Sequence, residues 1–504
     1  MKRFRFVILK NAAANVVRGG ASSIVALALP HFLTHSLSVD RYSAWVLMLQ
    51  IAAYANFLDF GLQTAVARYV AQAVERRDER HLNEVVSTAF FMMLAAALVA
   101  LIVAAFVVWQ IPHLFHKAPL NLIGELRWGA MILSIAAAAT LFLSLFTGTL
   151  VGLHRNDLPA LAIGTTRLIG ATAAIIVVRF TPSLIWMALC VGAFNILGAL
   201  WQIALAYRVL PDMRVALRWF TRTKVRELAH YCAGLATFSF GMLLVGGLDL
   251  TIVGYFAFAA AGYYGIASTV VGFVTGISGA VYSALLAPMA VLQERGEQSR
   301  IRDLVVDSSR LGSYMSIAFV ILLVLAGRPL MSLWVGPSYA SRAFPILEIL
   351  LWAQAIRLTA SSYSTALVAT GQQNYGIAGA FVEGITNLAA SILGARFIGP
   401  VGVAWGTAIG AVCGILWMLF YTMRKAKEVP VRASAFSMDA ILRPIFCFLP
   451  LLLYVGLSRH LRPALAYLVV ALLLTLSLLL WLGDVRPLPF GNRRFGVPRG
   501  TQLL

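Results

Sequence analysis

Three arginines lie inside apolar stretches that are each long enough to cross a lipid bilayer: Arg18, Arg167 and Arg357. An ionisable side chain at the bilayer centre costs about 2.5–3.5 kcal/mol on insertion scales, so it usually faces a cavity or a partner. A guanidinium group stays charged and binds phosphate or carboxylate oxygens through parallel N–H groups. We therefore expect the three arginines to bind an anionic substrate. Arg357, near the middle of its stretch, is the main candidate.

Two of these arginines also have simpler interpretations. The side chain of Arg18 is long enough to extend to the cytoplasmic headgroups while its stem stays in hydrocarbon. Arg167 could instead pair with Glu383, because each lies some eight to ten residues inside a cytoplasmic turn of its own half of the chain. Both alternatives leave Arg357 as the most deeply placed cation, roughly 20 Å from either end of its span at about 1.5 Å per residue.

Three acids also fall within apolar stretches: Asp59, Asp249 and Glu383. Intramembrane carboxylates commonly carry protons or coordinate ions in transporters. All three are candidates for cation coupling or gating, with coupling to a Na⁺ or H⁺ gradient open. Residue type alone does not identify the ion.

Other catalytic chemistry finds little support in the sequence. The four cysteines stand singly, and the His113-x-x-His116 pair has no thiol or carboxylate nearby, so we expect no metal site. No G-x-x-x-x-G-K-[ST] motif is present to hold ATP. We predict a protein without a cofactor that is not an enzyme.

The composition indicates that the apolar stretches around these charges lie in a membrane. Of 504 residues, 60% are hydrophobic and 12% are charged, about half the roughly 25% of a soluble domain. Since a span needs about 20 apolar residues, the chain predicts an all-α integral membrane protein with about 14 transmembrane helices. The expected spans are 12–34, 43–63, 85–109, 129–152, 159–178, 184–207, 229–252, 263–288, 311–333, 343–368, 376–395, 402–423, 441–457 and 464–482.

Basic residues predict the orientation. With the N-terminus inside, cytoplasmic segments hold 28 of the 40 lysines and arginines, periplasmic segments nine, and spans three. This bias follows the positive-inside rule and places both termini in the cytoplasm of a bacterial inner membrane. The net charge of +20 thus indicates anchoring at the membrane rather than nucleic-acid binding. The basic segment 208–228 is expected to form an amphipathic helix on anionic headgroups.

The chain also repeats itself with an offset near 219 residues. Gly152 aligns with Gly371, Trp186 with Trp405, and Val85-Val86 with Val305-Val306. Because each half holds six spans, the halves share one orientation and are related by a pseudo-two-fold axis along the membrane normal, as in transporters that rock one half against the other. The expected units are an N-lobe (1–215), a C-lobe (216–430) and a tail with spans 13 and 14 (431–504).

One local pattern carries a family resemblance. Asp59, Gly61, Leu62, Ala65 and Arg68 form D-x-G-L-x-x-A-x-x-R after a first span that contains Pro30. Together with the span count, the repeat and the tail, this resembles bacterial polysaccharide flippases of the O-antigen type. These belong to the superfamily of multidrug, oligosaccharidyl-lipid and polysaccharide exporters.

The resemblance implies a two-lobed transporter with a central cavity. Its substrate would be an undecaprenyl-diphosphate-linked oligosaccharide, moved from the cytoplasmic to the periplasmic leaflet for lipopolysaccharide or exopolysaccharide synthesis. Polysaccharide polymerase or other assembly proteins would be its partners. A multidrug or organic-cation exporter is the main alternative, although such a protein should place acids rather than arginines in its cavity. A membrane-embedded polymerase or ligase is less favoured because no large periplasmic loop is present.

Overall fold

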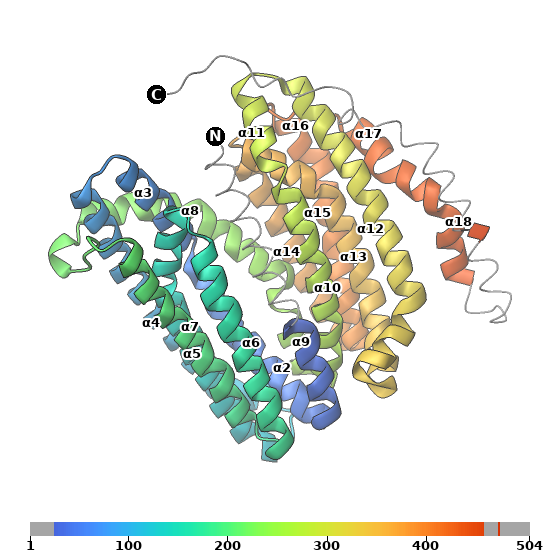
Figure 1. Cartoon of the computed structure of the whole chain (residues 1–504). Helices are drawn as coiled ribbons and strands as arrows, with labels where there is room; N and C mark the ends of the chain where they lie inside the picture. Colours follow the sequence, from blue (N-terminus) through green and yellow to red (C-terminus); the bar gives the residue numbers. More distant parts are fainter. Residues whose placement is uncertain (1–24, 458–471, 474–504) are drawn as a thin grey trace. The chain divides into compact units, whose positions relative to one another are not determined.

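The computed structural model describes residues 25–457, 472 and 473, and within these residues it is helical and contains no β-strand (Figure 1). Eleven helices are long and apolar enough to cross a membrane, or twelve if one bent pair forms a single span, counted over the described residues. The predicted all-α membrane fold with about 14 spans is confirmed. The first expected span is described as a helix over 25–36. Arg18 and most of the expected span 464–482 lie outside the described residues.

The N-terminal half continues with one broken span and four long helices. They are α2 (Val39–Ala53), the 3₁₀ segment η1 (Tyr54–Asp59), α3 (Leu62–Glu75), α4 (Glu79–Leu114), α5 (Leu120–Gly152), α6 (Asp157–Phe180) and α7 (Leu184–Val209). α5 is the central helix of this half, because it packs against α2, α3, α4 and α7.

The C-terminal half repeats this order and is followed by a tail. Its helices are α8 (Arg222–Met242), the π-helical η3 (Leu243–Gly247), α9 (Asp249–Phe256), α10 (Ala260–Ser283), α11 (Leu286–Glu294), α12 (Gln298–Val335), α13 (Pro337–Ala369), α14 (Gln373–Ile398), α15 (Pro400–Trp417), η4 (Met418–Thr422) and α16 (Met423–Lys425). The tail contains α17 (Ala433–Phe436), η5 (Ser437–Leu442) and α18 (Arg443–Leu457).

The helix boundaries reproduce the sequence repeat. α4 and α12 start at Glu79 and Gln298, and α5 and α13 at Leu120 and Pro337, which are offsets of 219 and 217 residues. Two residues separated by 219 also touch, since the Gly262 N–H donates to Ser43 Oγ at 3.0 Å. Equivalent points of a two-fold arrangement meet only near its axis. The lobe boundaries at 215 and 430 remain a prediction.

The second span of the first half is broken rather than continuous as the expected range 43–63 implies. In the first half, Phe60 (φ 49°) and Gly61 (φ 77°) adopt left-handed conformations, and the chain bends by 40° between η1 and α3. In the second half, the expected range 263–288 lies within one candidate span, Ala260–Glu294, where a short turn separates the end of α10 at Ser283 from the start of α11 at Leu286. Pro288 has no N–H to offer the carbonyl of residue 284, which accounts for a break at that turn.

Most other spans are longer than predicted, because the helices extend beyond the apolar core on both sides. The expected span 85–109, for example, is part of the 36-residue helix α4. The prediction of one amphipathic helix over 208–228 is wrong. α7 ends at Val209 and α8 begins at Arg222, and the only helical turn between them is the 3₁₀ segment η2 (Leu217–Trp219). The side chains of α4 explain this, since Asn83 Oδ1 accepts from Arg214 N at 2.7 Å and Ser87 Oγ from Ala216 N at 3.2 Å.

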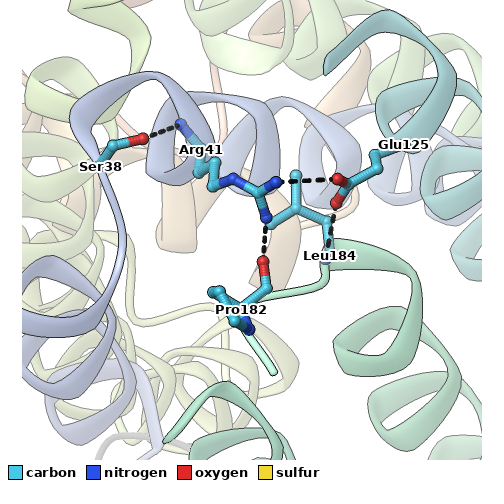
Figure 2. Close-up of polar contacts among 5 residues, drawn as sticks. All are labelled: Ser38, Arg41, Glu125, Pro182 and Leu184. Carbon is cyan, nitrogen blue, oxygen red and sulfur yellow. Dashed lines mark hydrogen bonds and ion pairs between the residues drawn. The ribbon is translucent and has the colours of Figure 1, made fainter. Parts of the chain in front are cut away.

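A polar cluster at the predicted periplasmic end holds three elements of the N-terminal half together (Figure 2). Arg41 of α2 forms an ion pair with Glu125 of α5 at 3.0 Å and also donates to the carbonyl of Pro182. The second oxygen of Glu125 accepts from the backbone N–H of Leu184 at 3.1 Å. A carboxylate there satisfies an unpaired N–H and complements the positive end of α7.

The chain divides into two compact units. The first comprises 1–280, 328–354 and 374–417, and the second 281–327, 355–373 and 418–504. Within the second unit, Glu428 accepts from Gln293 Nε2 at 3.0 Å and Gln298 Nε2 at 2.9 Å, so the loop after α16 is attached to α11 and α12. These two hydrogen bonds lower the pKa of the Glu428 carboxyl below its ordinary value.

Some glycines permit close helix packing and others do not. A Cβ on Gly402 would lie 2.0 Å from the backbone oxygen of Gly394, so α14 and α15 are in backbone contact there. In contrast, nothing lies within 4 Å of a Cβ built on Gly272, Gly276 or Gly279. Close packing therefore explains Gly394 and Gly402 and leaves Gly272, Gly276 and Gly279 unexplained.

We predict that Gly402→Val will lower the thermal unfolding midpoint of the detergent-purified protein by several degrees, because the added carbons force two backbones apart. Overpacking of this kind typically costs about 1–3 kcal/mol. Gly272→Val is the matched control and should shift the midpoint little. Equal effects of the two substitutions, measured by thermal unfolding with size-exclusion readout, would contradict the assigned packing.

Candidate functional site

Arg167 lines a cavity of about 400 Å³ within the first compact unit. The cavity lies among the 25–36 helix, α2, α6, α7 and α10, and Arg167 is the one charged residue among the described residues that line it. Asn195 and Thr269 add polar groups, while most of the wall is apolar, including Pro30 and Leu49. A guanidinium with neutral hydrogen-bonding neighbours on an apolar wall suits one anionic group attached to a larger ligand.

Of the three predicted arginines, Arg167 is the one found among the described residues that line this cavity. Arg357 is half-buried on α13, in the second compact unit, and Arg18 is outside the described residues. Arg167 is the eleventh residue of the 24-residue helix α6, so it lies just on the predicted cytoplasmic side of the middle of its span. Binding of substrate by Arg18 and Arg357 stays a prediction, as does the pairing of Arg167 with Glu383.

Asp249 is the centre of a buried polar cluster in the first unit. The residue is 6% exposed. Its Oδ2 accepts from Thr407 Oγ1 at 2.9 Å and from Tyr264 Oη at 3.3 Å, and its Oδ1 accepts from Asn387 Nδ2 at 3.3 Å. Ser391 Oγ donates to Asn387 Oδ1 at 2.8 Å. The donors come from three helices, α10, α14 and α15, so one carboxylate holds all three to α9.

A helix irregularity positions this carboxylate. Asp249 begins α9 one residue after the π-helical segment η3, which contains Gly246 and Gly247. The carbonyl of Val245 accepts from Asn387 Nδ2 at 2.5 Å instead of serving only its own helix. π-Helical turns recur at functional sites, and interrupted helices near the bilayer midplane supply carbonyls and side chains to coupling ions in transporters.

The oxygen atoms of this cluster suit a monovalent cation or a proton. Oxygen atoms of Asp249, Asn387, Thr407 and Ser391 lie together, and Val403 O accepts from Ser391 Oγ at 3.2 Å. Hard cations prefer such oxygen ligands. The set contains a single carboxylate, and among the described residues no group of three or more His, Cys, Asp or Glu side chains could hold a metal ion. A single negative charge balances one unit of positive charge.

The same segment contacts α2 directly. Gln50 Nε2 donates to Gly247 O at 2.6 Å, and Tyr54 Oη hydrogen-bonds Thr251 Oγ1. One further contact lies towards the predicted periplasmic end, where Ser43 Oγ donates to Ala259 O at 3.0 Å. Asp249 is two residues from both Gly247 and Thr251. A shift of the backbone at Asp249 would therefore be transmitted to α2 through the hydrogen bonds of these two residues.

The two remaining acids occupy different surroundings. Asp59 ends η1 at the helix break, and its Oδ1 accepts weakly from Gln63 N at 3.4 Å, which fits a role in shaping the bend. Glu383 is half-buried on α14, and a Cβ built on Gly414 would lie 2.9 Å from its Oε2. Neither residue belongs to the Asp249 cluster. Their assignment to coupling or gating stays a prediction.

The neutral partners of Asp249 were not identified from the sequence. Asn387 and Ser391 lie four and eight residues after Glu383 on one face of α14. That i, i+4 spacing of polar residues in an apolar helix was the available signal. Thr407 carried no comparable signal, because it is a single polar residue among apolar neighbours.

Comparison with known proteins places the chain in a family. A family model described as "Polysaccharide biosynthesis protein" matches residues 37–343. The chain belongs to this polysaccharide biosynthesis family. No curated protein sequence matches it.

Solved structures show the same fold at low sequence identity. The lipid II flippase MurJ in an inward closed conformation is 14% identical, with a TM-score of 0.70 over 94% of this chain and 97% of that chain. An inward-facing multidrug resistance MATE transporter of the MOP superfamily is 15% identical, with a TM-score of 0.65 over 84% and 99%. A MOP superfamily transporter from Pyrococcus furiosus is 14% identical, with a TM-score of 0.54 over 86% and 96%. The family member thus has a MOP transporter fold.

We predict that Asp249→Leu will destabilise the purified protein much more than Asp249→Asn. Leucine leaves the Thr407, Tyr264 and Asn387 donors without their acceptor, and a buried unsatisfied group costs about 1–3 kcal/mol. Asparagine keeps one oxygen acceptor in nearly the same volume. Thermal unfolding of both variants provides the test, and a leucine variant as stable as wild type would show that the cluster is not formed.

Proposed function

We propose that this polysaccharide biosynthesis protein is a flippase that moves an undecaprenyl-diphosphate-linked oligosaccharide from the cytoplasmic to the periplasmic leaflet. The observation that carries the proposal is the Arg167 cavity: one central guanidinium on an otherwise neutral, mainly apolar wall. A diphosphate next to a polyprenyl chain matches that division between charge and hydrocarbon. The family match supports a polysaccharide pathway, and the transporter fold supports a carrier rather than an enzyme.

The charge of this cavity also favours an anionic over a cationic cargo. An exporter of organic cations would gain from a carboxylate among the residues that contact the cargo, and no described residue lining the cavity is acidic. Asp249, the buried acid of the first unit, is already surrounded by hydrogen-bond donors and does not line that cavity.

Alternating access needs a closure that can open. The hydrogen bonds from Ser43 to Ala259 and from Gly262 to Ser43 close α2 against the start of α10. This contact joins the two sequence halves at the predicted periplasmic end, while the Arg167 cavity lies between the same two helices farther along. Separation at Ser43 and Gly262 would expose the cavity to the periplasm.

A coupling cation would act through Asp249. A bound Na⁺ or proton would neutralise the carboxylate and redistribute its hydrogen bonds from Thr407, Tyr264 and Asn387. Because η3 and α9 also hold Gln50 and Tyr54 of α2, that redistribution reaches the closing contact. Coupling therefore requires no direct contact between the cation and the transported lipid.

The first test is accumulation of undecaprenyl-diphosphate-linked oligosaccharide in cells depleted of this protein, separated by leaflet. We expect a build-up in the cytoplasmic leaflet that wild type reverses and Arg167→Ala does not, with at least a tenfold loss of rescue. Arg167→Lys should rescue partially, because an ammonium retains the charge without the planar fork.

Arg179→Ala is the matched control, since it removes an exposed arginine from the last turn of the same helix. It should rescue fully at equal expression. Full rescue by Arg167→Ala would remove that residue from the substrate site. No build-up at all, with normal surface polysaccharide, would overturn the flippase proposal in favour of drug export. Arg357→Ala in the same assay tests the predicted contact on α13.

A second test addresses coupling. In proteoliposomes with an imposed Na⁺ or H⁺ gradient, Asp249→Asn should abolish the stimulation of lipid-linked oligosaccharide transport by the gradient while slow gradient-independent exchange continues. Glu383→Gln serves as the comparison, because it neutralises an acid on α14 outside the Asp249 cluster. Gradient stimulation that persists in Asp249→Asn and disappears in Glu383→Gln would assign coupling to Glu383.

A further inference from the structure

A second cationic pocket lies at the predicted periplasmic end of the first compact unit. Its volume is about 500 Å³, and it is lined by Lys117, Arg342 and the loop 257–259 between α9 and α10. Tyr263, Ile346 and Pro400 complete its walls, and no acidic residue is among the described residues that line it. It is separate from the Arg167 cavity, with which it shares no lining residue.

Both cations are held in place but not neutralised. Lys117 Nζ donates to the carbonyl of Phe256 at 2.6 Å, and Arg342 Nη1 donates to Tyr263 Oη at 3.1 Å. The guanidinium of Arg342 also lies over the Tyr263 ring, 5.4 Å from its centroid. Lysine has three donors and arginine five, and each residue uses only one of them in these contacts. No carboxylate forms an ion pair with either within the described part of the chain.

The backbone adds to the positive potential. α15 begins at Pro400, so the N-terminal end of an 18-residue helix faces the same pocket through Pro400 and Val401. Helix N-termini carry a partial positive charge and favour anions. One ammonium and one guanidinium group beside a helix N-terminus form an arrangement that favours phosphate over neutral ligands.

We propose that this pocket binds a phosphate-bearing ligand at the outer mouth of the protein. If the proposed function holds, the ligand is the diphosphate of the translocated lipid as it leaves the closing contact at Ser43 and Gly262. The headgroup of an anionic phospholipid offers the same chemistry. Because both cations are exposed, the affinity should fall as ionic strength rises.

Binding of pyrophosphate to the full-length protein in phosphatidylcholine nanodiscs tests the site. We expect Lys117→Gln and Arg342→Gln each to raise the Kd at least about tenfold, since each removes a charge-assisted contact. Glutamine retains an N–H donor for Phe256 or Tyr263, so the fold should survive. Arg179→Gln removes one exposed charge from the same predicted side outside the pocket and should leave the Kd within about twofold.

Two further arms make the outcome decisive. Repeating the titration in an Arg167→Gln background removes binding at the intramembrane cavity, and the pocket variants must still weaken the remaining binding. Adding phosphatidylglycerol to the nanodiscs separates the sources: competition with pyrophosphate assigns the pocket to a lipid headgroup, and no competition assigns it to another phosphate-bearing ligand. Unchanged affinity in both pocket variants, or no pyrophosphate binding by wild type, would overturn the site. Because the readout is binding, these results are independent of the transport assays.

Discussion

A charge inside hydrocarbon must be neutralised, hydrated or hydrogen-bonded, and this requirement organises the functional part of the protein. Asp249 meets it with three neutral donors from three helices. Arg167 meets it at the wall of a cavity. The acid is enclosed and the base is accessible; under the proposed function the arginine would contact the anionic cargo and the acid would respond to the coupling cation.

The irregular helix segment η3 provides hydrogen-bonding groups next to Asp249. A regular helix satisfies its own carbonyls, so it offers none to a ligand or to a neighbouring side chain. At η3 the carbonyls of Val245 and Gly247 are shared with Asn387 and Gln50. The irregular segment thereby joins the Asp249 cluster on one side to α2 on the other. The backbone hydrogen bonds that the helix loses at η3 are thus replaced by contacts between the two sequence halves.

The sequence repeat accounts for the position of the contact between Ser43 and Gly262. Ser43 and Gly262 are equivalent positions of the two halves, and they touch at 3.0 Å. Glycine is required on one side, because a Cβ on Gly262 would come within 2.9 Å of both Ser43 Oγ and the Tyr42 ring. Near such an axis two equivalent helices cannot both carry bulky side chains. The small pair there allows close approach without a permanent apolar seal.

The sequence by itself determined the membrane fold, the approximate spans and the family, because hydropathy, charge bias and short motifs are local properties. It also made Arg167 and Asp249 candidate site residues, since a charged residue in an apolar stretch can be recognised without knowing its neighbours in space. Tertiary structure alone decided which neutral residues surround Asp249, because Tyr264, Asn387 and Thr407 lie 15, 138 and 158 residues away along the chain. It also decided that segment 208–228 is not one helix, since the partners of its backbone, Asn83 and Ser87, lie on α4. Contacts between distant residues depend on helix packing, and no local pattern encodes them.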